Sequence, residues 1–162
     1  MNYYENVFDS DDVEEIWQSY LSEPRWQFGH VSVENSDNCH WLMDLNNEDF
    51  FTKNLFSNLK NLIGEFKLSS VYANGQTYGL DGDIHVDSED DNYYTFLYYP
   101  MMYWDLNWGG ETVIIRPEGI TETVYPKPNT GVLFPSNWGH FGKGPSRYCT
   151  DLRVTIAFKL YR

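Results

Sequence analysis

The stretch Asp83-Ile84-His85-Val86-Asp87 carries an imidazole and a carboxylate two residues apart. In an extended chain, residues i and i+2 point to the same side, so the side chains of His85 and Asp87 converge on one point. The segment 137–141 adds a later histidine, His140. Two histidines and one carboxylate bind one face of an ion and leave its other positions open, which suits Fe(II) oxygen chemistry. We therefore predict a metal site made of His85, Asp87 and His140.

A His-x-Asp pair on its own is weak support for a metal site, because a surface histidine and aspartate in an acidic loop give the same pattern. The order of the segments after this pair makes the pattern more specific. A strand, a second strand that begins with two glycines, a late histidine and a strand opened by arginine come after the pair in that order. The other two histidines, His30 and His40, have no carboxylate at this spacing, and we predict surface or hydrogen-bonded roles for them.

The strand opened by arginine supplies a cation for the same site. In Arg153-Val-Thr-Ile-Ala-Phe158, the arginine, Thr155 and the alanine share one face of the strand, and larger apolar residues share the other. An arginine on a face of small residues can reach into a cavity and hold a carboxylate with two hydrogen bonds. Lys143 and Arg147 are alternative cations, but they lie in a loop rich in Gly, Pro and Ser, where we expect solvated side chains.

A cation at this place fits the needs of an oxygenase. Such an enzyme requires two electrons beyond those that its substrate supplies, and a keto acid bound at the iron can provide them by decarboxylation. A dicarboxylic keto acid such as 2-oxoglutarate also carries a remote carboxylate, and a carboxylate buried in a protein needs a cationic partner. The sequence therefore predicts Arg153 as the partner of that carboxylate.

The remainder of the chain predicts helices followed by many short strands. Apolar residues at helical spacing predict helices over residues 9–23, capped by Asp9, and over residues 47–63, ended by Gly64. A turn is expected at Asn74-Gly75. Strands are expected over residues 25–33, 68–73, 93–99, 111–116, 121–125, 131–134 and 152–160. This order of elements is typical of a sandwich or barrel with helices on one face.

The composition narrows the classes of function. A chain of 162 residues is expected to form a single domain, and we find neither a signal peptide nor a membrane-spanning stretch, which predicts a cytoplasmic protein. The net charge of −13 repels phosphate backbones, so we expect no nucleic acid partner. The two cysteines, Cys39 and Cys149, leave one disulfide open but do not resemble a zinc site. Aromatic residues make up 18% of the chain, and we expect some of them to form contact surfaces.

Several segments taken together resemble a known family of enzymes. They are His85-Val-Asp87; Thr95-Phe-Leu-Tyr-Tyr99; Trp108-Gly-Gly-Glu-Thr112, continuing to Arg116-Pro117; and Pro126–Phe134, followed by His140 and Arg153. With these segments the chain resembles the 2-oxoglutarate- and Fe(II)-dependent dioxygenases, and among them the prolyl 4-hydroxylase-like branch. The likeness covers mainly the C-terminal half, and the helical N-terminal part matches only in kind.

The resemblance implies a mainly β fold, a double-stranded β-helix of the jelly-roll or cupin-like type, with N-terminal helices packed on one sheet. We expect one dioxygenase domain over residues 1–162. Residues 1–66 would form the helical support and first strand, and residues 67–162 the β-helix core with the metal site.

The same resemblance implies the roles of individual residues. His85, Asp87 and His140 would bind Fe(II), and Arg153 would hold the remote carboxylate of 2-oxoglutarate. Tyr99 matches a family tyrosine that donates to that carboxylate. Further cosubstrate contacts are expected from Tyr72 and Thr155, and for the two tyrosines core packing is the alternative.

The reaction implied is hydroxylation of proline in a peptide or protein, using O2, with oxidative decarboxylation of 2-oxoglutarate to succinate and CO2 and with ascorbate as an optional reductant. Aromatic residues on loops expected near the iron would line a groove for a proline-rich segment in the polyproline II form. These residues are Tyr78, Tyr103, Trp104 and Trp108. Packing of these rings against one another at the mouth of the barrel is the alternative.

Two other functions stay open from the sequence. One is a hydroxylase of a free amino acid or another small substrate, which no residue excludes. The other is a metal-binding β-helix domain without oxygenase activity. A buried Arg153 argues against the second, because a protein without a cosubstrate has no need of it.

Overall fold

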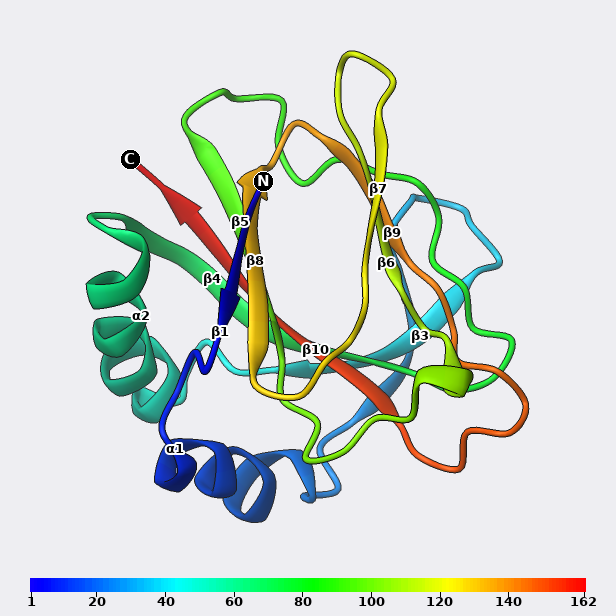
Figure 1. The fold of residues 1–162 in the computed structure, drawn as a ribbon, viewed down its shortest axis with the longest axis horizontal. Coiled ribbons are helices and arrows are strands. Elements are labelled where there is room, and N and C mark those ends of the chain that lie inside the picture. The colour runs from blue at the N-terminus through cyan, green and yellow to red at the C-terminus, as the bar shows by residue number, and fades with distance from the viewer.

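Two antiparallel sheets form the framework of the computed structural model, which describes all residues from 1 to 162. In spatial order the larger sheet contains β1 (Asn2–Glu5), β8 (Thr130–Pro135), β5 (Tyr93–Tyr99), β10 (Arg153–Tyr161), β4 (Lys67–Gln76), β3 (Cys39–Asp44) and β2 (Gln27–Val31). The smaller sheet contains β7 (Thr121–Val124), β6 (Thr112–Ile115) and β9 (Gly139–Gly142). Figure 1 shows the helices on one side of the larger sheet and the smaller sheet on the other. The predicted mainly β fold with helices on one face is confirmed.

The helices form where the apolar spacing predicts them. The first comprises α1 (Ser10–Glu15) and a wider, π-type segment (Ile16–Leu21); the second comprises a π-type segment (Phe50–Leu55) and α2 (Phe56–Ile63). The Asp9 side chain accepts a hydrogen bond from the backbone N–H of Asp12 at 2.8 Å, as expected of an N-cap. Gly64 follows α2 with a φ of 94°, a conformation that favours glycine.

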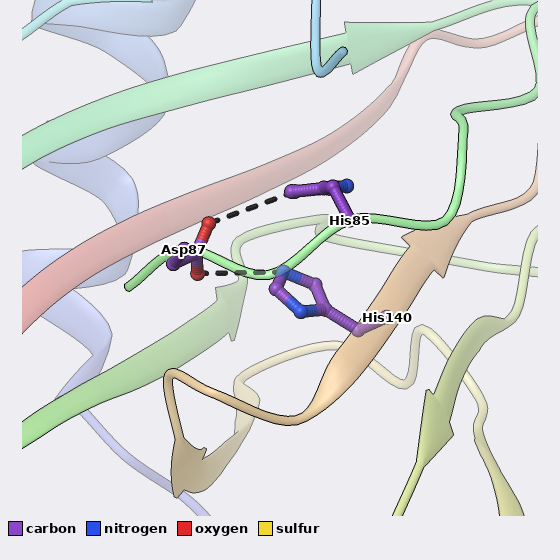
Figure 2. A group of neighbouring side chains, drawn as sticks. All are labelled: His85, Asp87 and His140. Atoms are coloured by element: carbon purple, nitrogen blue, oxygen red, sulfur yellow. Dashed lines mark ion pairs between the residues drawn. The ribbon is translucent and has the colours of Figure 1, made fainter. Parts of the chain in front are cut away.

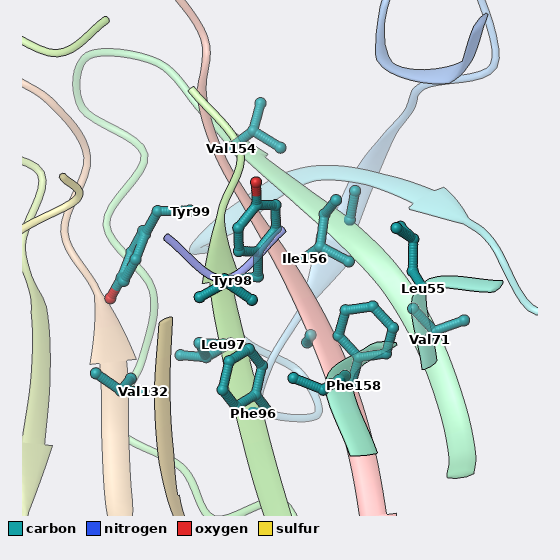
Figure 3. Close-up of a cluster of buried hydrophobic side chains, with 14 of the residues drawn as sticks. Leu55, Val71, Phe96, Leu97, Tyr98, Tyr99, Val132, Val154, Ile156 and Phe158 are labelled. Atoms are coloured by element: carbon teal, nitrogen blue, oxygen red, sulfur yellow. The ribbon is translucent and has the colours of Figure 1, made fainter. Parts of the chain in front are cut away.

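Strand β10 lies between β5 and β4 and separates the core from the opposite side of the sheet. Its residues Val154, Ile156 and Phe158 are fully buried. Figure 3 shows Ile156 and Phe158 close to Phe96 and Tyr98 of β5, in the core that the helices cover. The alternate residues of β10, beginning with Arg153, face the smaller sheet, so the predicted division of this strand into two faces is confirmed.

The predicted turn at Asn74-Gly75 is wrong, because β4 continues through both residues to Gln76. Gly75 is paired on both sides, with Val154 of β10 and Trp41 of β3. A Cβ on Gly75 would lie 2.9 Å from Leu152 Cδ2 and 3.1 Å from Trp26 Cζ3. The glycine therefore permits close packing over a strand, and tertiary pairing overrides the local turn signal.

Three strands were not predicted from the sequence: β1, β3 and β9. Strand β1 pairs with β8 at the edge of the larger sheet, β3 joins β4 to β2, and β9 pairs with β6. Both cysteines are free thiols, so the disulfide left open by the sequence does not form. No helix here has both the length and the apolar character that a bilayer crossing requires.

Gly131 offers a test of the packing between β8 and β5. A Cβ at this position would lie 2.4 Å from Phe96 Cζ and 3.0 Å from the backbone oxygen of Leu97. We expect Gly131→Ala to lower the free energy of unfolding by about 1–3 kcal/mol through overpacking, measured by urea denaturation. Gly139→Ala is the matched control, because its nearest atom would lie at 3.6 Å. Equal stability of the two variants would contradict this packing.

Candidate metal centre and cosubstrate cavity

Backbone pairing brings the three predicted metal ligands together. The N–H of His85 donates to the backbone oxygen of His140 at 3.1 Å, and the N–H of His140 donates to that of His85 at 2.9 Å. The N–H of Asp87 donates to the backbone oxygen of Ser136 at 2.9 Å. Figure 2 shows the three side chains, with both histidines directed at the Asp87 carboxylate. Their ligand atoms all lie within 4.8 Å of one another.

Both histidines present the same ring nitrogen to this point. Nδ1 of His85 lies 2.9 Å from the backbone oxygen of Asp83, and Nδ1 of His140 lies 3.1 Å from that of Trp138. A carbonyl only accepts, so each Nδ1 carries a proton, and each Nε2 faces the Asp87 carboxylate. Burial lowers the pKa of His140. With Nδ1 used as the donor to the backbone, Nε2 is the ring nitrogen available to a metal.

Asp87 is ionised in this setting. Burial opposes ionisation, but the neighbouring rings of His140 and His85 and the ammonium of Lys159 outweigh it and hold the pKa of Asp87 well below its usual range. Thr95 Oγ1 donates to Asp87 Oδ2 at 2.5 Å, and Lys159 Nζ contacts the same oxygen. Two imidazoles and one carboxylate are a donor set that fits Fe(II).

Arg153 lies in the same cavity, and it is a buried cation without an acidic partner. The residue is 1% exposed and takes part in no ion pair. Its Nε donates to the backbone oxygen of Gly110 at 2.5 Å, Nη1 donates to Gln76 Oε1 at 2.6 Å, and Nη2 donates to Thr112 Oγ1 at 2.8 Å. A guanidinium has five donors, so one N–H on each terminal nitrogen remains for a ligand. Burial lowers the pKa of Arg153, the sign of a charge that lacks compensation.

The residues predicted around the cosubstrate divide into two groups. Tyr72 and Thr155 line the cavity. Tyr99 is fully buried behind Thr112, and its hydroxyl donates to Thr112 Oγ1 at 2.8 Å. Tyr99 therefore reaches the Arg153 end of the cavity through Thr112. Lys143 and Arg147 are exposed, as the loop composition predicts.

One cavity of about 310 Å³ joins the metal cluster to Arg153. Its walls come from both sheets, and all four histidines of the chain lie on them. His40 is only 4% exposed, so of its two predicted roles, surface or hydrogen-bonded, the surface role is wrong; burial lowers its pKa to about 4. Asp87 is the single acidic residue of the lining. The cavity thus offers a positive environment in an acidic protein.

The aromatic residues predicted to bind substrate do not line this cavity. Tyr78 and Tyr103 are 66% and 61% exposed on loops. Trp104 is 7% exposed, donates from Nε1 to the backbone oxygen of Gly109 at 3.0 Å, and packs edge-on against Trp108 at 5.1 Å between ring centroids. Trp104 and Trp108 therefore support the loop that carries Gly110, a hydrogen-bond partner of Arg153. Because Trp104 is buried, its ring does not form an open platform for a substrate.

Several site residues were missed by the sequence analysis. Lys159 could have been found by extending the alternation of Arg153 and Thr155 along β10. Thr95 and Thr112 lie inside the segments quoted for the resemblance but carry no local signal of their own. Gln76 reaches Arg153 because β4 pairs with β10 in a register that places the two opposite each other, and the sequence does not reveal that register.

Solved structures of other proteins share the fold of this chain. No protein-family model and no curated protein matches the chain. Among solved structures, a Trichoplax adhaerens prolyl hydroxylase in complex with a hypoxia inducible factor oxygen degradation domain peptide fragment superposes with a TM-score of 0.74 at 16% identity, over 99% of this chain and 82% of that one.

Two bacterial structures match in a similar way. A Pseudomonas putida prolyl-4-hydroxylase gives a TM-score of 0.73 at 15% identity, over 99% of this chain and 91% of that one. A 2OG-Fe(II) oxygenase family oxidoreductase from Burkholderia pseudomallei gives 0.74 at 10% identity, over 97% and 82%. At these identities the likeness establishes architecture. The chain has the double-stranded β-helix fold of the 2-oxoglutarate oxygenases.

Proposed function

We propose that this protein is an Fe(II)- and 2-oxoglutarate-dependent dioxygenase that hydroxylates proline in a peptide or protein. One observation carries the proposal: a single cavity holds two histidines and a carboxylate at one place and a buried arginine without an acidic partner at another. A cluster of this composition suits iron, and an unpaired buried cation requires an anion. A keto acid with a second carboxylate satisfies both.

Separate residues of the chain would bind the metal and the cosubstrate. His85, Asp87 and His140 would hold Fe(II), which when bound supplies oxygen activation coupled to decarboxylation of 2-oxoglutarate. The two free N–H groups of Arg153 would bind the remote carboxylate as a fork, which fixes the direction of the cosubstrate. Thr112 links that guanidinium to the hydroxyl of Tyr99, and Tyr99 thereby holds the position of the cation.

The choice of proline in a peptide rests on a neighbour of the same fold and on two exposed rings. A neighbour of the same fold was solved with a peptide fragment bound. Tyr78 and Tyr103 expose rings that could stack on a proline-rich segment. Against this, the cavity wall contains neither ring, so a small substrate such as a free amino acid is the second candidate.

The metal ligands are tested by His140→Ala. Loss of one of three ligands should weaken Fe(II) or Mn²⁺ binding by more than about a hundredfold, beyond what changes in the partners of ligands cause, and should abolish turnover. Calorimetric titration with Mn²⁺ measures the first effect. His30→Ala is the control, since His30 lines the same cavity outside the cluster. Unchanged metal affinity in His140→Ala would remove this residue from the site.

Arg153 is tested by a substitution that keeps its charge. Arg153→Lys loses the fork, and a hydrogen bond to a charged group is worth about 1.5–3 kcal/mol. We therefore expect the dissociation constant of 2-oxoglutarate to rise by roughly ten- to a hundredfold, with Mn²⁺ affinity unchanged. The exposed Arg147→Lys serves as control. If only the Arg147 variant loses cosubstrate affinity, the cation has been wrongly assigned.

The substrate class is tested with a library of proline-containing peptides. After incubation with Fe(II), ascorbate and 2-oxoglutarate, we expect mass spectrometry to find peptides that have gained one oxygen atom on proline. Succinate formation without substrate is measured in parallel, because it reports on the iron and cosubstrate sites alone. Turnover of free proline with no peptide product would transfer the protein to the amino-acid hydroxylases.

A further inference from the structure

Lys159 is the charged residue of the cavity for which the proposed reaction has no assigned role. It lies on the cavity face of β10, directly opposite Thr95 on β5. Its side chain is 14% exposed, and its ammonium lies 5.5 Å from the centre of the Tyr72 ring. The ammonium contacts Oδ2 of Asp87. Neighbouring strands therefore hold this cation against a predicted metal ligand.

Lys159 and Thr95 make the two oxygens of Asp87 unequal. Oδ2 contacts Lys159 Nζ, accepts from Thr95 Oγ1 at 2.5 Å, and lies 3.4 Å from His140 Nε2. Oδ1 accepts no hydrogen bond from the protein and lies 3.6 Å from His85 Nε2. A carboxylate can bind a cation through one oxygen or through both. With Oδ2 engaged by two donors, Oδ1 is the oxygen left for a metal.

We propose, building on the function proposed above, that Lys159 is a positioning residue that keeps Asp87 a one-oxygen metal ligand and so preserves a coordination position for O2. Two histidines and one carboxylate oxygen would hold the ion from one side and leave its other positions to the keto acid and O2. An aspartate bound through both oxygens would leave one position fewer for them.

The charge of Lys159 has a second consequence at the same place. A cation beside Asp87 opposes a divalent ion bound to the same carboxylate. The site therefore binds metal less tightly than its three ligands alone would allow. If Lys159 served only to neutralise a buried carboxylate, its removal would also tighten metal binding, but the position for a diatomic ligand at the metal would stay open. Binding of such a ligand, measured together with metal affinity, separates these two roles.

The experiment compares metal binding in the full-length wild type and in Lys159→Met. Calorimetry with Mn²⁺ should show binding that is tighter on the order of tenfold in the variant, within the range over which partners of metal ligands change affinity. Nitric oxide, a stand-in for O2, should bind less tightly to the variant loaded with Fe(II) and 2-oxoglutarate, as read from its electron paramagnetic resonance signal. Lys143→Met is the matched control, because it removes the same charge from an exposed loop.

Lys159→Arg, which keeps a cationic donor, should return both measurements to near the wild-type values. If the methionine variant does not fold, Lys159→Gln gives the same comparison without the charge, and tighter Mn²⁺ binding is expected there as well. Unchanged or weaker Mn²⁺ binding, or unchanged nitric oxide binding, overturns the role of Lys159. A wild type that takes up neither Mn²⁺ nor Fe(II) overturns the metal site itself.

Discussion

The pleat of β10 is the constraint on which both the core and the cavity depend. Because side chains alternate along a strand, Val154 and Ile156 enter the core while Arg153 and Lys159 enter the cavity. A shift of one residue would exchange the two sets, burying two cations among apolar side chains. The irregularity in the pairing with β4 comes directly after Lys159, so the alternation is kept over the length of strand that the cavity uses.

The sequence predicts the grouping of His85, Asp87 and His140 better than the strands that carry these residues. His85 and Asp87 are recognisable because an i, i+2 pair needs only an extended backbone, and they could be named without knowing their neighbours. Strand β9, which holds His140, reads Gly-His-Phe-Gly and lacks an apolar alternation. It forms because it pairs with β6 and, through His140, with His85, and these long-range contacts leave no local signal.

The same limit applies to the surroundings of Arg153. Arg153 could be predicted from its strand, but its partners Gln76, Thr112 and Gly110 come from three other places in the chain. The Asn74-Gly75 pair carries a strong turn signal, yet pairing on both sides keeps it in β4 and thereby places Gln76 opposite Arg153. The loop aromatics show a related limit: composition reveals that rings are present, whereas the burial of Trp104 and its hydrogen bond to the backbone of Gly109 follow only from the folded loop.

The distribution of charge shows how an acidic protein could accept the anionic ligand proposed above. The chain has a net charge of −13, yet two cations, Arg153 and Lys159, line the cavity against one carboxylate. Surface charges are screened over about 10 Å at 0.1 M salt, whereas charges within a cavity act on a ligand at short range in a medium of lower polarity. The net charge therefore argues against long polyanions, which must lie along the surface. A small dianion that enters the cavity meets a local field of the opposite sign, and that field comes from Arg153 and Lys159, two of the alternate residues of β10.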